Sequence, residues 1–250
     1  MTQAILAIET SAACCGVALL LAANGQTHLY HREHHGVQEH SARLLPMVDE
    51  VLAEAGLPRT ALTAVAFGQG PGGFTGLRVA CGVAQGIAFA LDIPVIPVVS
   101  HEAIAAETAA EPGDRVLVLM DARMSEVYAA VYERQDEADA FAVVCAPVLM
   151  ALSSIPAWLQ TFAAPHGESW LAGDARQVYP EAFDRTPPLR QSPVLRPSVL
   201  ALARLAQYKY RHGLSGSAEQ ASPLYVRDKV AFTTEERAAG AGGNPRAAQA

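Results

Sequence analysis

The chain has 250 residues, of which 51% are hydrophobic and 17% charged, and its formal net charge is −7. This length is enough for one large domain or two smaller ones with a substantial hydrophobic core. The negative charge argues against a chain that binds nucleic acid by itself, because affinity for a phosphate backbone depends on clustered cations.

The first half of the chain predicts three strands followed by alternating helices and strands. Asn24-Gly25 is the strongest short hairpin signal, since both residues tolerate positive φ. Thr75 is the expected N-cap of a helix that follows a glycine-rich loop. The periodicity of apolar residues predicts strands at 4–8, 15–21, 27–32, 64–67 and 94–99, and helices at 38–55 and 75–91.

The same order begins again near residue 115, with strands expected at 115–120, 126–132, 141–144 and 169–172 and helices at 154–162 and 197–212. Each half opens with an apolar strand that ends on an acid, Glu9 or Asp121, before a hairpin. This internal repeat indicates an α/β fold of two similar lobes, residues 1–110 and 111–230, with Glu9 and Asp121 bordering one cleft. Residues 231–250 are small and polar, and we expect a disordered tail there.

The loop GQGPGGFTGLR (68–78) partly matches two phosphate-binding patterns. The dinucleotide pattern G-x-G-x-x-G requires an acid after the next strand, where this chain has Ser100. The Walker A pattern requires a lysine where this chain has Phe74. Neither match is complete, and a tight strand-to-helix turn is the simpler alternative.

The helix after this loop has almost no polar face, because Arg78 and Gln85 are its only polar side chains from residue 76 to 91. Small residues recur at every fourth position of this helix, at Gly76, Ala80, Ala84 and Ala88. Gly82 and Gly86 form a second small pair with the same spacing. We expect one face to lie on the sheet and another on a second helix, supplied by this chain or by a partner. A helix buried wholly inside one core is the alternative.

Four stretches together resemble the TsaB (YeaZ) family: ILAIETSAACCGVALL, GQGPGGFTGLRVACGVAQGIAFAL, MDARMSEVYAAVY and SPLYVR. The resemblance runs from residue 4 to about 230. It implies an actin-like, ASKHA-type (RNase H-like) fold of two lobes, with mixed sheets flanked by helices. It also implies a non-catalytic dimerisation subunit for forming N6-threonylcarbamoyladenosine in tRNA, which pairs with the catalytic TsaD and is joined by the ATPase TsaE. Under this resemblance tRNA is bound only through the complex, and a homodimer of the free chain stays open.

The resemblance further implies a partner interface formed by the glycine loop and two helices: His40, Leu44, Gly72, Phe74, Gly76, Arg78, Ala80, Gly82, Val83, Ala84, Gly86 and Ile87. We expect Ala84→Arg to abolish pairing while the monomer stays folded.

The turns Glu9-Thr10-Ser11 and Asp121-Ala122-Arg123 would correspond to the two phosphate loops of the actin-like fold. No clear adenine-binding glycine pair follows them, so no cofactor is expected, with ATP or ADP at a subunit interface left open.

The residues also bear on three other candidate functions. Five histidines lie close together, but a helical metal pair needs a second histidine four positions after His40, where Leu44 stands, so no metal is expected. A peptidase needs a nucleophile with a base or a metal-activated water, and Ser11 beside Glu9 is not a triad. An actin-like small-molecule kinase or ATPase, with Glu9 and Asp121 organising Mg²⁺, is the main alternative.

The expected compartment is the cytoplasm. The four cysteines lack the spacing of a disulfide framework, which suits a reducing environment. Met1-Thr2-Gln3 leads directly into a strand, so we expect no signal peptide. The longest apolar stretch, residues 77–99, is interrupted by Gln85, Asp92 and two prolines and is not expected to span a membrane.

Overall fold

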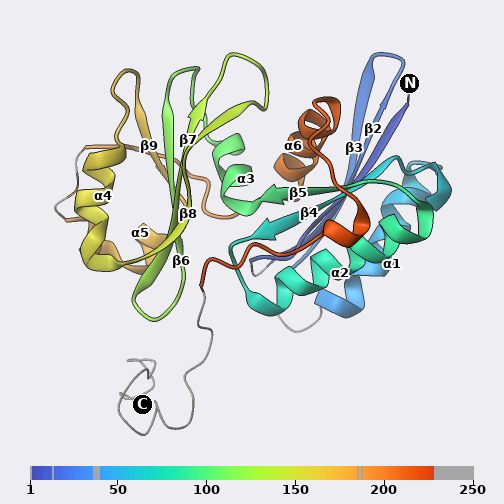
Figure 1. Ribbon diagram of the computed structural model, residues 1–250, viewed down its shortest axis with the longest axis horizontal. Helices are drawn as coiled ribbons and strands as arrows, with labels where there is room; N and C mark the ends of the chain where they lie inside the picture. The colour runs from blue at the N-terminus through green and yellow to red at the C-terminus, as the bar shows by residue number, and fades with distance from the viewer. Residues whose placement is uncertain (1, 13, 36–39, 185, 187, 228–250) are drawn as a thin grey trace, which may run out of the picture.

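The computed structural model describes residues 2–12, 14–35, 40–184, 186 and 188–227. The tail predicted for residues 231–250 lies outside these residues. The described chain forms two five-stranded sheets that lie side by side, each flanked by helices (Figure 1).

The first lobe holds β1 (Gln3–Glu9), β2 (Cys14–Ala23), β3 (Gln26–His35), α1 (His40–Glu54), a short 3-10 helix (Arg59–Ala61), β4 (Ala64–Gly70), α2 (Phe74–Leu91), β5 (Val95–Val99) and α3 (Ser100–Glu107). Its strand order is β3-β2-β1-β4-β5, with β1 antiparallel to β2 and parallel to β4. Asn24 and Gly25 both have positive φ at the predicted hairpin. Helix α2 begins at Phe74 with Gly73 as its N-cap, two residues before the cap expected at Thr75.

The second lobe holds β6 (Arg115–Asp121), β7 (Glu126–Arg134), β8 (Phe141–Ala151), α4 (Ile155–Phe162), β9 (Ser169–Ala172), α5 (Ala175–Val178) and β10 (Arg190–Gln191), with 3-10 turns at Leu152–Ser154 and Pro180–Phe183. Its strands lie in the order β8-β7-β6-β9-β10, with β6 antiparallel to β7 and parallel to β9. The order and directions of the first sheet are therefore repeated. The internal repeat predicted from the sequence is present in the topology.

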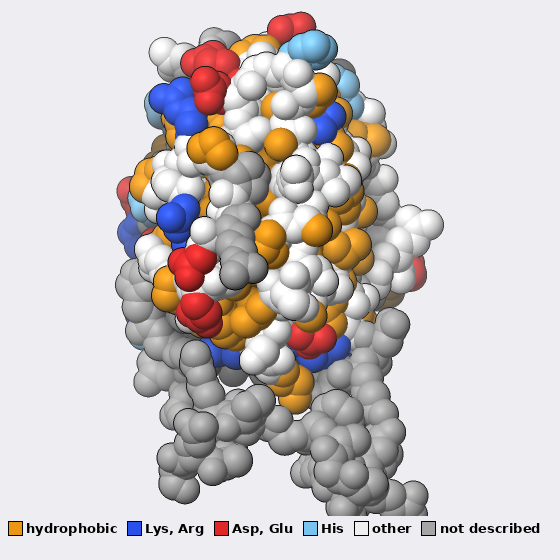
Figure 2. All heavy atoms as spheres, turned by 90° about the vertical axis from the view of Figure 1, so that its left-hand side faces the viewer, with side chains coloured by type: hydrophobic (Ala, Val, Ile, Leu, Met, Phe, Trp, Pro, Cys, Tyr) orange, Lys and Arg blue, Asp and Glu red, His pale blue; other side chains and the backbone are white. Residues whose placement is uncertain are grey.

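Alternating residues of each central strand face opposite layers. On the first sheet, Leu6 and Ile8 pack with α1 and α2, whereas Ile5 and Ala7 pack with α3 and α6 (Val199–Arg211). Helices α4 and α5 cover one face of the second sheet. The end of the molecule formed by this lobe shows hydrophobic side chains interspersed with polar and charged ones (Figure 2).

Helix α6 corrects the predicted lobe boundaries. The sequence predicts that all of 111–230 belongs to the second lobe, but α6 packs on β1 and β2 of the first sheet. The chain therefore returns to the first lobe after β10. Helix α3 lies between the lobes, with Ala103 in a core of the first sheet and Ile104 and Ala105 in a core of the second.

Candidate functional site

The turn after β1 is sealed inside the first lobe. Glu9 is 3% exposed, and its carboxylate accepts hydrogen bonds from the Ser11 backbone N–H at 2.6 Å and from Ser100 Oγ at 3.3 Å. Burial raises the pKa of this carboxyl, although the hydrogen bonds from Ser11 and Ser100 oppose the shift. The acid that would lead a phosphate loop is thus a core residue.

The glycine loop fills the space against this turn. A Cβ at Gly68, Gly72 or Gly76 would overlap the carboxylate of Glu9, the carbonyl of Ser11 or the carbonyl of Thr10, respectively. Thr10 Oγ1 donates to the carbonyl of Gly76 at 2.7 Å, and the Gly73 N–H donates to the carbonyl of Ser11 at 2.8 Å. The loop therefore needs glycine for close approach of two backbones. Its N–H at Gly73 is directed to a carbonyl, where a phosphate loop would leave it open to an anion.

The equivalent turn after β6 lies open to a cavity. Asp121 Oδ1 accepts hydrogen bonds from the Arg123 backbone N–H and from the Tyr179 hydroxyl, both at 2.8 Å. Arg123, Met124 and Ser125 have φ values of 64°, 56° and 59°. Left-handed backbone costs L-residues about 1–2 kcal/mol each, so the surrounding bonds must hold this turn in place.

A second carboxylate, Asp174, is hydrogen-bonded to the backbone of the turn after β6. Its Oδ1 accepts the backbone N–H of Asp121 at 2.9 Å. Burial raises the pKa of the Asp174 carboxyl, and the negative charge of Asp121 raises it further, while the N–H of Asp121 opposes the shift.

A cavity of about 680 Å³ lies between the two lobes. Its walls come from the glycine loop, from the turn after β6 and from the last described segment: Pro71, Gly72, Gly73, Phe74, Leu77, Asp121, Ala122, Arg123, Met124, Ser125, Tyr128, Leu152, Tyr179, Glu181, Leu224, Tyr225, Val226 and Arg227. Asp121 faces this cavity, and Glu9 is buried behind the glycine loop. The prediction that both acids border one cleft is therefore wrong for Glu9.

The two turns differ in what they offer to a ligand. The second presents one carboxylate and an exposed guanidinium, Arg123, which is paired with Asp121 at 3.4 Å. The described residues contain no group of three or more histidine, cysteine, aspartate or glutamate side chains placed to hold a metal ion. Of the clustered histidines, His28 and His31 are exposed on the edge strand β3. The side chain of His40 lies outside what the structure describes.

The residues predicted to form a partner interface divide into two groups. Leu44, Ala80 and Ala84 are fully buried in the chain's own core beneath α1 and α2. Phe74, Arg78, Gly82 and Gly86 are exposed, and Gly72, Gly76, Val83 and Ile87 are half-buried. The expectation for Ala84→Arg is wrong, because an arginine there would disrupt the core of the monomer. The helical period identifies two small-residue faces but does not tell which one the sheet covers.

Two exposed side chains beside this surface were missed by the sequence analysis. Phe89 on α2 is 70% exposed and Leu45 on α1 is 49% exposed. The nearly absent polar face of α2 was the sequence signal that could have indicated exposed apolar side chains on this helix. Within the part of the chain that the structure describes, α2 is the one helix long and apolar enough to pass a composition test for a membrane span, and its inner face packs along β4.

Comparisons with known proteins agree with this architecture. A family model described as "TsaD: tRNA N6-adenosine threonylcarbamoyltransferase" matches residues 21–153. The chain is 34% identical to the tRNA threonylcarbamoyladenosine biosynthesis protein TsaB of Haemophilus influenzae, over 91% of this chain and 95% of that protein. It is also 34% identical to the TsaB of Escherichia coli, over 91% of this chain and 96% of that protein.

Two solved structures from Pseudomonas aeruginosa have the same fold. YeaZ superimposes with a TM-score of 0.74 and 35% identity, covering 89% of this chain and 99% of that one. A protein described as similar to peptidase YeaZ superimposes with a TM-score of 0.75 and 34% identity, covering 90% and 100%. The repeated sheet topology, the sealed glycine loop and these similarities together identify the chain as a member of the TsaB (YeaZ) family.

Proposed function

We propose that this chain is an accessory subunit for the formation of N6-threonylcarbamoyladenosine in tRNA, acting through a TsaD-type catalytic subunit. The names of its TsaB relatives support the pathway. The observation that carries the non-catalytic role is the sealed first turn, where the glycine loop packs directly on residues 9–11. A second subunit would then hold the substrates, which fits a net charge of −7. We place the complex in the cytoplasm and include a TsaE-type ATPase as its third member.

The same turn argues against the peptidase and kinase alternatives. The side chain of Ser11 is only 4% exposed and lies beneath the glycine loop, where a substrate cannot reach it. Buried Glu9 is separated from the cavity that Asp121 faces, so the pair is not arranged to share one Mg²⁺. Steady-state ATP hydrolysis by the purified chain tests the kinase alternative directly. Turnover comparable to that of an ATPase would favour that hypothesis.

The exposed surface of α2 is our candidate for the partner interface. Gly82 and Gly86 let another backbone approach closely, and exposed Phe89 and Leu45 add apolar area at its margins. A second copy of the chain could use the same face when no partner is present, and a nucleotide could bind where two subunits meet.

Gly82→Leu tests the interface without disturbing the monomer. A Cβ at Gly82 meets no atom within 4 Å, so the larger side chain fits on the outside of α2. Size-exclusion chromatography with a TsaD-type subunit is expected to show loss of the mixed complex. Gln160→Leu on α4 of the other lobe adds the same side chain to an exposed helix and should leave pairing intact. Wild-type pairing by the Gly82→Leu protein would exclude this face.

A further inference from the structure

The last described segment, residues 221–227, crosses from the first lobe to the second (Figure 1). It contains the SPLYVR motif, to which the proposed function assigns no role. We propose that this segment, the clasp, holds the two lobes together across the mouth of the cavity, and that Arg227 is its latch. This inference does not depend on the partner or the pathway.

The first end of the clasp is bound to the glycine loop by backbone and side-chain hydrogen bonds. The Leu224 N–H donates to the carbonyl of Gln69 at 2.7 Å, and Gln69 Nε2 donates to the carbonyl of Ser222 at 3.1 Å. The reciprocal pair fixes the register of the clasp along the end of β4. The Leu224 N–H and the Gln69 side-chain amide thus each have an acceptor, and they hold this end of the clasp against the end of β4.

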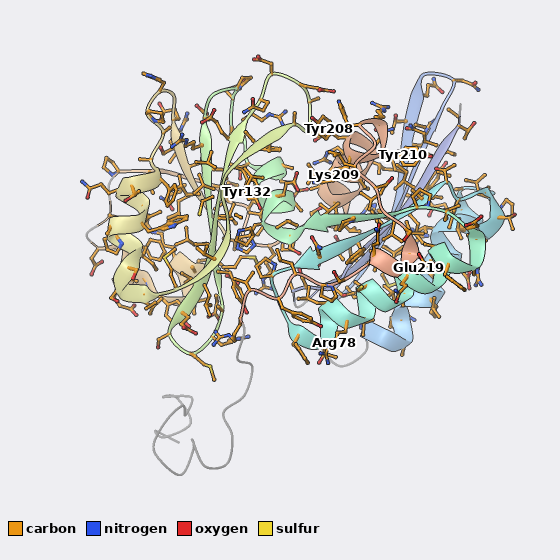
Figure 3. All side chains as sticks on the ribbon, viewed as in Figure 1. Arg78, Tyr132, Tyr208, Lys209, Tyr210 and Glu219 are labelled. Carbon is orange, nitrogen blue, oxygen red and sulfur yellow. The ribbon has the colours of Figure 1, made fainter. Side chains whose placement is uncertain are left out.

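An aromatic and cationic stack adds to this anchor. Arg78 Nε donates to the hydroxyl of Tyr225 at 2.8 Å, and its guanidinium lies 3.7 Å from the centre of the Phe74 ring. The rings of Phe74 and Tyr225 are 5.7 Å apart. Figure 3 shows Arg78 near the beginning of α2. The clasp is thereby joined to the beginning of α2.

The second end of the clasp is bound to the other lobe through one side chain. Arg227 Nη2 donates to the carbonyl of Ala122 at 2.8 Å, and Nη1 lies 2.7 Å from Glu126 Oε2. The arginine side chain is only 16% exposed. Charge-assisted bonds of this kind are stronger than neutral ones. They also flank the strained residues 123–125, so the latch supports the turn on both sides.

The lobes have a second connection, which is of a different kind. Helix α3 packs into cores of both sheets, and His101 Nε2 lies 3.2 Å from the carbonyl of Tyr128 in β7. An ion pair 3.7 Å long joins Arg204 of α6 to Asp139 of the β7–β8 hairpin. In Figure 1, α3 and the clasp lie at different heights between the lobes. The packed core around α3, with these polar contacts, therefore holds one side and the latch holds the other, so release of the latch would open the cavity at that side.

Hydrogen–deuterium exchange on the full chain tests the latch, with Arg115→Ala as the control for Arg227→Ala. Arg115 pairs with Glu133 at 3.1 Å within the second lobe, is 18% exposed and also donates to backbone carbonyls. It matches the latch in charge and burial without joining the lobes. We expect Arg227→Ala to raise exchange about tenfold in residues 121–126 and 221–227, and Arg115→Ala to leave both segments unchanged.

Glu126→Gln tests the latch from the other lobe with a milder change. It leaves Arg227 in place but removes the negative charge that holds it. Exchange is expected to rise in residues 221–227, including the Leu224 amide that is bound to the first lobe. Wild-type exchange in the clasp of both Arg227→Ala and Glu126→Gln would overturn the proposal. Equal increases in Arg227→Ala and Arg115→Ala would overturn it as well, because the effect would then be general loss of stability.

Discussion

The turns after β1 and β6 occupy equivalent places in two sheets of the same topology, and their surroundings are opposite. The first carries Glu9, which is buried and hydrogen-bonded to Ser11 and Ser100, under a glycine loop that leaves no room for a ligand. The second carries Asp121, which faces a cavity and is held by Tyr179. The two sheets thus share one topology, but of these two turns the one after β6 is accessible and the one after β1 is covered.

The beginning of α3 connects these two turns. Ser100 donates to Glu9 of the first, and His101 lies in hydrogen-bond contact with β7, just beyond the second. The comparison teaches that an acid at the end of a central strand is not by itself a site. Its role depends on how the strand-to-helix connection of the neighbouring parallel strand packs on it. The glycine loop covers Glu9, whereas the β9–α5 connection binds the N–H of Asp121 through Asp174 and leaves Asp121 lining the cavity.

The largest effect is expected where the glycine loop meets the first turn. Gly76→Ala would place a methyl group against the backbone carbonyl of Thr10, so we expect a loss of about 3 kcal/mol in the free energy of unfolding, at the upper end of the usual cost of overpacking. A Cβ at Gly82, on the same helix, meets no atom within 4 Å. Gly82→Ala should therefore raise the free energy of unfolding by up to about 1 kcal/mol. Urea unfolding of both variants measures this. Equal effects would mean that the first turn is not sealed by close packing.

The next effect concerns His101, between the two turns. Burial lowers the pKa of its imidazole from 6.5 to about 4, although the hydrogen bond to the Tyr128 carbonyl opposes the shift. Between pH 6.5 and 4 the unfolded chain binds more protons than the folded one. Stability is therefore lost as the pH falls through this window, by up to about 3 kcal/mol.

His101→Gln is expected to remove this part of the acid sensitivity. His28→Gln, on the exposed edge strand β3, is the control and should leave the pH dependence unchanged. Thermal or urea unfolding at several pH values between 4 and 7 gives the slope. An unaltered slope in the His101→Gln protein would contradict a neutral, buried imidazole at the lobe boundary.

A smaller effect is expected at the open turn. Tyr179→Phe removes the hydroxyl that donates to Asp121, and we expect a loss of about 1 kcal/mol in the free energy of unfolding, the usual net contribution of one hydrogen bond. Hydrogen exchange should rise in residues 121–126 and stay unchanged in residues 68–76. Tyr128→Phe removes a hydroxyl from the same cavity and serves as the control. A change spread evenly over both turns would show that they are not independent.

Much of this arrangement could be predicted from local pattern. Asn24-Gly25 identified the hairpin, and the apolar strands ending at Glu9 and Asp121 revealed the repeat. The reason for Gly68, Gly72 and Gly76 could not be predicted, since each of the three packs against a residue about sixty positions away. Close approach of distant backbones leaves no trace in the local sequence other than the glycine itself.

Two assignments failed for a related reason. The period of α2 shows small residues on two faces, but only the position of the sheet reveals that Ala84 is inside and Gly82 outside. The return of α6 to the first sheet is likewise invisible in chain order, because amphipathic helices of either lobe have the same pattern. Burial and long-range pairing are properties of the folded chain.

The most direct test of the central claim is a reconstitution of tRNA modification. The purified chain is incubated with ATP, threonine, bicarbonate and tRNA, alone and with TsaD-type and TsaE-type subunits and a source of the threonylcarbamoyl adenylate, and modified adenosine is quantified. The account predicts none without the catalytic subunit and a strong dependence on this chain when that subunit is present. Modified adenosine formed by this chain alone, or formation that is unaffected by leaving it out, would contradict the accessory role.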